Sequence, residues 1–283
     1  MIMKMNATSK KTSMYACLPA YRSKEAQRTL NSKYIPPYLK QAQWAEFTKL
    51  KEIIGEIYNV RNQSLMVFDI GIGYARIPAL LSDVATWNKI GRYVGIDISN
   101  HCVAQSRRIV STKGIDDKVE IVKFDAVDLY TRYDKFLKDG QYNLVVCTYF
   151  TAGDFKPDKI EIRTKKDGLI DNYDMNLLEP NKNFVAVFKG AYNLLRVGGR
   201  IVIGSIYHDS DFVRKIQENF YRNCNMTVIT SSRDPFTATL EGFWSERFNH
   251  KKIYDYLSWI PRDKIELIPL DDYDFALMVV ITK

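Results

Sequence analysis

The sequence predicts an α/β fold in which a doubly wound, mostly parallel sheet carries helices on both faces. Short apolar runs alternate with segments of helical periodicity, and this alternation is typical of such a sheet. The run near residues 65–70 reads as a buried strand that enters a tight turn at Gly71 and Gly73. Glycines let the backbone turn sharply and let a ligand lie directly on it. Two further strands near 92–97 and 119–124 each end at a carboxylate, as in nucleotide-binding sheets.

The expected elements follow in chain order. Residues 37–58 should form a helix, because Pro36-Pro37 can open one and apolar residues then recur at helical spacing. Strands are expected near 65–70, 92–97, 119–124, 142–149 and 200–206, and helices near 74–85, 99–113 and 181–196. Strands near 225–231 and 264–270, with a last strand near 275–282, should finish the sheet.

Two connections are longer than this fold needs, at residues 153–180 and 231–249. In the first, the runs 160–164 and 169–173 flank a polar turn, which predicts a β-hairpin. Ligands of open α/β sheets bind at the carboxyl ends of the strands. Both insertions leave from or near that edge, so we expect them to wall a substrate pocket. Variation in surface loops is the alternative interpretation.

Composition limits the classes of protein to consider. The chain has 283 residues, enough for one large domain or two small ones, and an ordinary soluble composition. It lacks an apolar run long enough for a membrane helix and a secretory apolar core. Its four cysteines are scattered, which argues against a metal site or disulfides. These features predict a cytoplasmic protein that does not bind a membrane.

The net charge of +8 is concentrated at the N-terminus. Residues 1–51 carry ten Lys or Arg and only two acids, so this segment accounts for the whole excess. Such an arm can attract nucleic acid or an anionic substrate. A solvated, mobile terminus and an organellar transit peptide are the alternatives.

The glycine turn within 67–76, the strand-end acids of 92–99 and 119–126, and the helix–glycine–strand run 194–204 occur in one order. Together they resemble the class I S-adenosylmethionine-dependent methyltransferases over residues 60–283. The resemblance implies a seven-stranded, Rossmann-like sheet with an antiparallel C-terminal strand, an N-terminal helical lid, and S-adenosylmethionine as the cofactor. We expect residues 1–60 to form the basic arm and lid helix, and residues 61–283 to form the methyltransferase core.

The resemblance also implies roles for the strand-end residues. Asp69 would hold the ammonium group of the methionine end of the cofactor, and Asp97 would accept hydrogen bonds from both ribose hydroxyls. Asp125 would accept a hydrogen bond from the adenine amino group, with the Ala126 amide beside it. The other expected cofactor contacts are Gly71, Gly73, Ile98, Cys147 and, from the lid, Tyr21. The family's third glycine is replaced by Ala75, whose small methyl group should preserve helix–strand packing.

Methyl transfer is an in-line displacement, so the enzyme must mainly aim a nucleophile at the methyl group and exclude water. Tyr149 and Asp154 follow the fourth strand and are candidates for contacting the acceptor. His208 follows the fifth strand and is a candidate general base. Tyr149 packing over the cofactor, an Asp154 turn, and a His208 without a catalytic role are the alternatives. The absence of a Pro-Pro pair after the fourth strand counts against methylation of adenine amino groups or glutamine amides.

Several functions fit these residues. The leading hypothesis is methyl transfer to an N or O atom of a small-molecule acceptor. The second is an RNA methyltransferase guided by the basic arm, although we recognise no RNA-binding module. A nicotinamide-dependent oxidoreductase and a catalytically silent partner subunit are further alternatives. The sequence leaves the oligomeric state open.

Overall fold

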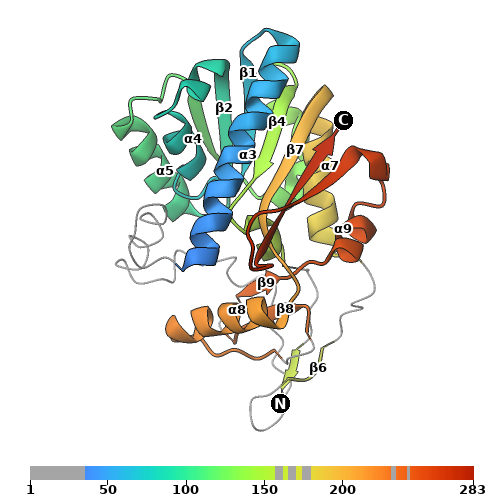
Figure 1. The fold of residues 1–283 in the computed structure, drawn as a ribbon. Helices are drawn as coiled ribbons and strands as arrows, with labels where there is room; N and C mark the ends of the chain where they lie inside the picture. The colour runs from blue at the N-terminus through green and yellow to red at the C-terminus, as the bar shows by residue number, and fades with distance from the viewer. Residues whose placement is uncertain (1–35, 157–161, 165–169, 174–179, 231–233, 241–242) are drawn as a thin grey trace.

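The computed structural model describes residues 36–156, 162–164, 170–173, 180–230, 234–240 and 243–283 (Figure 1). Residues 1–35 of the predicted basic arm and lid, among them Tyr21, lie outside these residues. None of the helices within these ranges combines the length and apolar character needed to cross a membrane.

The core is a seven-stranded sheet, as the sequence predicted. In spatial order its strands are β10 (Ile265–Pro269), β11 (Ala276–Thr282), β7 (Leu195–Tyr207), β4 (Tyr142–Cys147), β1 (Leu65–Ile70), β2 (Ile90–Asp97) and β3 (Val119–Lys123). Neighbours from β7 to β3 run parallel, while β11 is antiparallel to both β7 and β10. The parallel strands therefore present their carboxyl ends at one edge of the sheet.

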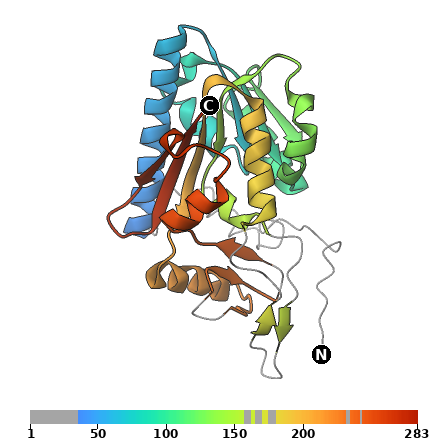
Figure 2. The ribbon, with the colours of Figure 1, turned by 90° about the vertical axis from the view of Figure 1, so that its right-hand side faces the viewer.

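Helices cover both faces of this sheet, which confirms the doubly wound arrangement (Figures 1 and 2). The helices α3 (Pro37–Arg61), α4 (Arg76–Leu81) and α5 (Asn100–Thr112) pack on one face, and α6 (Leu129–Arg132), α7 (Lys182–Leu194) and α9 (His250–Tyr256) pack on the other. Short 3₁₀ turns complete the connections: η1 (Ala85–Lys89), η2 (Ala126–Asp128), η3 (Tyr133–Phe136), η4 (Thr151–Asp154) and η5 (Arg262–Lys264).

Helix α3 shows why the local sequence folds as it does. Proline at its first position has a backbone already suited to a helix, and Asn62 ends it in the left-handed region with φ 51°. Between these ends, Phe47, Leu50 and Ile54 turn to the sheet and are buried. The predicted helix is therefore confirmed, and it extends three residues beyond the expected end.

The predicted strand near 225–231 is wrong for its described residues, 225–230. Helix α8 (Asp211–Asn223), which we did not predict, occupies the connection after β7, and its N-terminus is capped by the Ser210 hydroxyl. Asn225 then turns back with φ 59°, a conformation that interrupts an extended strand. Val228 makes only a single bridge, to Thr239.

The two insertions contribute small hairpins. Strands β5 (Ile162–Thr164) and β6 (Ile170–Tyr173) pair antiparallel, which confirms the hairpin predicted within 153–180. Strands β8 (Phe236–Ala238) and β9 (Trp244–Glu246) form the second pair. Figure 1 shows both hairpins and α8 below the carboxyl ends of the parallel strands. We call α8, β8 and β9 the cap.

Gly95 in β2 allows the glycine turn to pack on the sheet. A Cβ atom at Gly95 would lie 2.2 Å from Cδ1 of Ile72 and 2.9 Å from its Cβ and Cγ1. We expect Gly95→Ala to push Ile72 outward and to lower the free energy of unfolding by about 1–3 kcal/mol. Urea denaturation measures this change. Gly55→Ala is the matched control, because its Cβ would make only ordinary contact in a helix. Equal stability of both variants would contradict the prediction.

Candidate functional site

The turn after β1 brings backbone to the carboxyl edge of the sheet. Gly71 and Gly73 have φ values of 72° and 56°, in the left-handed region that favours glycine. The amides of Gly71 and Ile72 both donate to the Ile96 carbonyl at 2.9 Å, which fixes the turn beside the end of β2. A Cβ at Gly71 would lie 2.4 Å from Cγ2 of Thr151, so this turn packs closely against η4.

Ala75 takes the place of the family's third glycine at a left-handed position. Its φ is 54°, it is fully buried, and it is the residue before α4. The helix begins at the next residue, so the methyl group does not prevent the turn from passing into α4.

Asp69 lies next to the glycine turn and is only 2% exposed. One carboxylate oxygen accepts a 2.6 Å hydrogen bond from the Tyr93 hydroxyl. The other oxygen is buried and has no hydrogen-bond partner among the described residues. Burial raises the pKa of Asp69 to about 7, while the Tyr93 hydrogen bond and the Arg76 charge lower it. An unpartnered buried carboxylate oxygen can accept from a ligand ammonium group.

This raised pKa sets the expected behaviour of Asp69→Asn. The carboxyl group holds its proton to higher pH in the folded than in the unfolded protein. Its stabilising contribution is therefore complete below pH 3.8 and is lost as the pH rises through about 7. We expect the asparagine variant to be more stable than the parent at pH 8, by about 1–3 kcal/mol, and to lose this advantage at pH 4.

The same variant should bind the ammonium-bearing ligand at least about tenfold more weakly at pH 8, because a charged acceptor is lost. Urea denaturation at the two pH values and calorimetric titration at pH 8 check these results. The exposed Asp116→Asn is the control. If the stability difference between Asp69→Asn and the parent were the same at both pH values, the pKa of Asp69 would not be raised by burial.

Asp97 ends β2 and faces the same turn. Its two carboxylate oxygens accept hydrogen bonds from the backbone amides of Gly73, at 3.0 Å, and Ser99, at 2.8 Å. Burial raises the pKa of Asp97, and these two hydrogen bonds lower it. Each oxygen keeps a lone pair for a further donor. The residue is partly exposed, so a ligand can reach it.

Asp125 follows β3 and caps the turn η2 through a 3.1 Å hydrogen bond from the Val127 amide. Ala126 is the first residue of η2, and its side chain packs against the core. Ile98 and Asp125 both line a cavity that opens beside the sheet edge. The structure thus places the three strand-end acids on β1, β2 and β3, three neighbouring strands.

Sequence reasoning missed Glu46, which α3 brings to this site. Its carboxylate is fully buried, pairs with Arg76, and accepts a 3.1 Å hydrogen bond from the Tyr149 amide. A Cβ at Gly204 would lie 2.4 Å from a Glu46 oxygen, so this glycine makes room for the carboxylate. Two polar residues, Gln43 and Glu46, interrupt the apolar face of the predicted helix. This interruption is the sequence feature that could have identified Glu46 as a site residue.

The end of β4 has an unusual backbone. Tyr149 and Phe150 are both left-handed, with φ values of 56° and 64°, and such conformations cluster at functional sites. The Arg76 guanidinium lies 4.7 Å from the Tyr149 ring centre. Phe150 stacks on Tyr207 with ring centres 4.0 Å apart. Tyr149 therefore packs on the Glu46–Arg76 pair, between α3 and α4.

Within the part of the chain that the structure describes, several polar atoms around this pair are buried without a hydrogen-bond partner. They are Oδ1 of Asp69, Nη1 of Arg76, Oγ of Ser205, and both amide atoms of Gln43. An unpaired buried polar group costs about 1–3 kcal/mol, so such groups are typical of places completed by water or a ligand.

Cys147 and Asp154 flank the strained turn. Cys147 is fully buried, and burial together with the charges of Asp69 and Asp154 raises its pKa. Asp154 is exposed to solvent, yet the surrounding protein raises its pKa to about 7, and a hydrogen bond with Ser245 lowers it. Water can therefore reach the Asp154 carboxylate, although protein atoms surround most of it. Such a group can accept a proton near neutral pH.

The cap also contacts η4, next to Asp154. Ser245 of β9 also accepts a 3.2 Å hydrogen bond from Gln217 of α8. A Cβ at Gly153 would lie 2.9 Å from the Glu246 carbonyl oxygen, so η4 and β9 approach closely. Arg247 is 1% exposed and donates to Gln217 at 2.7 Å, which ties the cap together.

His208 lies at the end of β7, where it bridges Phe248. Its ring centre is 6.5 Å from that of His250, at the start of α9, and its Nδ1 is buried without a partner. Its role as a base stays a prediction. In the second insertion, Trp244 is 4% exposed and stacks on Phe236 with ring centres 3.9 Å apart.

Comparison with known proteins identifies the family of this chain. The profile described as "Methyltransferase domain" matches residues 61–257. No curated protein matches the chain in sequence. An S-adenosylmethionine-dependent methyltransferase from Clostridium acetobutylicum is similar in structure, with a TM-score of 0.54 and 10% identity over 93% of this chain and 99% of the other. Magnesium protoporphyrin IX methyltransferase from Synechocystis, with bound S-adenosylhomocysteine, has a TM-score of 0.50 and 10% identity over 93% and 95%.

Proposed function

Because the chain belongs to the methyltransferase domain family and is an S-adenosylmethionine-dependent enzyme, we propose that it methylates an N or O atom of a small-molecule acceptor held beneath the cap. The described residues fit this cofactor. Asp69 has a buried carboxylate oxygen without a hydrogen-bond partner among the described residues. At Gly71 and Gly73 the turn has no side chain of its own to cover the backbone. S-adenosylmethionine supplies an activated methyl group on a sulfonium centre.

We assign each of three acids to a different part of the cofactor. Asp69 would hold the ammonium group, where Oδ1 lacks a partner. Asp97 would accept from the ribose hydroxyls while the Gly73 and Ser99 amides keep its carboxylate in place. Asp125 would face the adenine, with Ile98 on the same cavity wall. Tyr21 of the predicted lid stays a candidate contact.

The observation that carries the small-molecule proposal is the close packing of β9 on η4. The acceptor must approach the methyl group from the carboxyl ends of β1 and β4, and the cap stands at that edge (Figure 1). Asp154 lies on η4, with Ser245 of the cap as its hydrogen-bond partner. The cap therefore contacts the carboxylate that we assign as proton acceptor.

Charge also favours a small molecule over RNA. From residue 209 to 247, the described chain carries five acidic residues and four basic ones, a net charge of −1. Proteins that bind nucleic acid place basic residues along the contact surface. The cap itself, α8, β8 and β9, carries three acidic and three basic side chains and so has no excess of positive charge.

In the proposed reaction the acceptor N–H or O–H lies against the Asp154 carboxylate. As the acceptor atom formed its bond to the methyl carbon, the sulfur–methyl bond of the cofactor would break with its electron pair left on the sulfur, and the acceptor proton would pass to Asp154. The cap excludes water and holds the two reactants in line, which contributes much of the rate enhancement. Tyr149 would support the site by packing over the Glu46–Arg76 pair.

The experiment that tests this proposal supplies methyl-labelled cofactor with either a metabolite panel rich in amines and hydroxyl compounds or bulk cellular RNA. We expect label in one or a few small molecules. The exposed Lys215→Glu variant, on α8 of the cap, should transfer methyl groups as well as the parent. Labelled RNA with no labelled metabolite would overturn the proposal and favour the alternative function. Loss of transfer by Lys215→Glu would show that the cap binds a larger anionic acceptor.

A further inference from the structure

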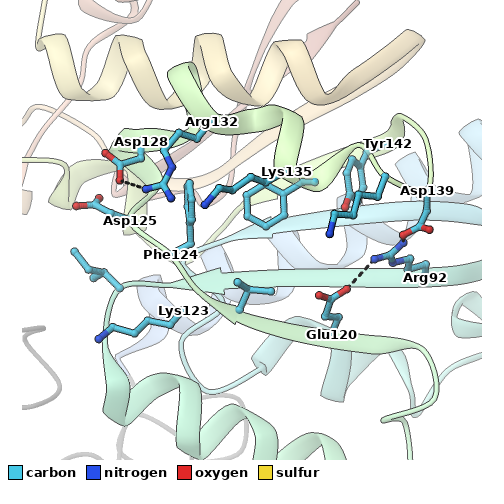
Figure 3. A pocket seen from close by; sticks show the side chains of 14 residues that line it. Arg92, Glu120, Lys123, Phe124, Asp125, Asp128, Arg132, Lys135, Asp139 and Tyr142 are labelled. Atoms are coloured by element: carbon cyan, nitrogen blue, oxygen red, sulfur yellow. Dashed lines mark hydrogen bonds and ion pairs between the residues drawn. The ribbon is translucent and has the colours of Figure 1, made fainter.

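We infer that the groove beside β3 binds a second small ligand, an aromatic ring bearing an anionic group, at the same time as the cofactor. Figure 3 shows this groove, which we call the β3 groove and define by the side chains lining it, among them Phe124, Lys135, Phe136 and Tyr142. Its volume is about 530 Å³, within the range typical of ligand pockets. The proposal does not rest on the identity of the methyl acceptor.

One wall of the groove is aromatic. Phe124 and Phe136 meet edge to face with ring centres 5.1 Å apart, and Phe68 joins Phe136 at 5.0 Å and Tyr142 at 5.1 Å. Phe136 is partly exposed. Offset and edge-to-face contacts with such a wall favour a flat aromatic ligand.

The charges of the groove favour an anion. Arg92 pairs with Glu120 at 2.7 Å and also with Asp139, and Arg132 pairs with Asp128 at 3.3 Å. These pairs involve three of the four acids in the lining (Figure 3). Among the residues that the structure describes, no acid forms an ion pair with the three lysines of the lining, Lys123, Lys135 and Lys138. The lining carries five basic and four acidic side chains, so its net charge is +1.

A hydroxyl group is also left without a partner. Tyr142, at the start of β4, is fully buried, and its hydroxyl makes no hydrogen bond with any residue that the structure describes. Figure 3 shows it near Arg92 and Glu120, and Lys135 lies between it and Phe124. Lys135 and Lys138 are exposed, flexible side chains, so their movement can open the hydroxyl to a ligand oxygen. A ligand with an anionic oxygen beside an aromatic ring would satisfy the lysines and the hydroxyl together.

The groove runs away from the cofactor. Ile98 and Asp125 lie at the cofactor end, whereas Arg92 lies near the start of β2. Asp97 comes five positions after Arg92, which is about 16 Å along an extended strand. A ligand held at Tyr142 and Lys135 would therefore sit beside the adenine position without replacing it.

Fluorescence titration with anilinonaphthalene sulfonate, an aromatic anion, tests the site on the full chain saturated with S-adenosylhomocysteine. We expect binding to persist in the saturated protein. Lys135→Glu should weaken it about tenfold or more, because an attractive charge becomes repulsive. Tyr142→Phe should weaken it about fivefold, the loss of one hydrogen bond. The exposed Lys215→Glu and Tyr130→Phe are matched controls and should bind the dye like the parent.

Displacement of the dye identifies the source of the anion. Naphthoate competing better than adenosine monophosphate would indicate an aromatic carboxylate, and the reverse order would indicate a nucleotide. Either order supports the site when Lys135→Glu abolishes the competition. Stoichiometric displacement of the dye by S-adenosylhomocysteine would overturn the proposal, because the groove would then be part of the adenine site. Unchanged dye affinity in both groove variants, with melting temperatures like that of the parent, would overturn it equally.

Discussion

Asp97→Ala is expected to weaken binding of S-adenosylmethionine by roughly 30- to 1000-fold, or about 2–4 kcal/mol, because two hydrogen bonds to the ribose are lost. The structure adds a second cause. Asp97 accepts from the amides of Gly73 and Ser99, so the variant also releases the glycine turn. Calorimetric titration with S-adenosylmethionine and S-adenosylhomocysteine measures the loss for both ligands.

Asp117→Ala is the control for this experiment, since Asp117 is exposed and lies outside the strand end. Asp97→Asn separates the two causes, because asparagine keeps one oxygen acceptor for an amide but cannot accept from both hydroxyls. We expect its affinity to fall between those of the parent and the alanine variant. An alanine variant that binds as tightly as the parent would remove Asp97 from the ribose site.

Asp154→Asn is expected to lower kcat by about a hundredfold or more, the usual loss when a general base is removed. The amide keeps the shape of the side chain and cannot take up the proton. The pH profile gives the second measurement. The pKa of Asp154 is raised to about 7, so parent activity should rise with pH through about 7 as the carboxylate loses its proton. The variant should lack this rise.

Cofactor affinity should stay close to that of the parent in Asp154→Asn, because the residue lies on η4 and is not one of the three strand-end acids that we assign to the cofactor. Asp263→Asn, an exposed change in η5, is the control. An asparagine variant with full kcat and an unaltered pH profile would show that the acceptor arrives without a proton to lose, as a neutral amine can. Our assignment of Asp154 as the base would then be wrong.

The sequence by itself determined the sheet and the cofactor, and it predicts the place where the cofactor binds. These follow from local patterns: the apolar runs of parallel strands, the turn at Gly71 and Gly73, and a carboxylate at the end of three strands. The strand predicted near 225–231 failed because an apolar run of a few residues carries no information about its pairing partner. Asn225 takes a left-handed conformation there, and the chain joins the cap instead.

Only the tertiary structure decided how the site is completed. Glu46 reaches the Tyr149 amide across 103 residues of sequence, and Tyr93 reaches Asp69 from the neighbouring strand. The raised pKa of Asp69 depends on how thoroughly the surrounding residues exclude water. The packing of β9 on Gly153 likewise joins two distant segments. Periodicity and spacing report which face of an element is buried, whereas contacts between distant segments depend on how the whole chain packs.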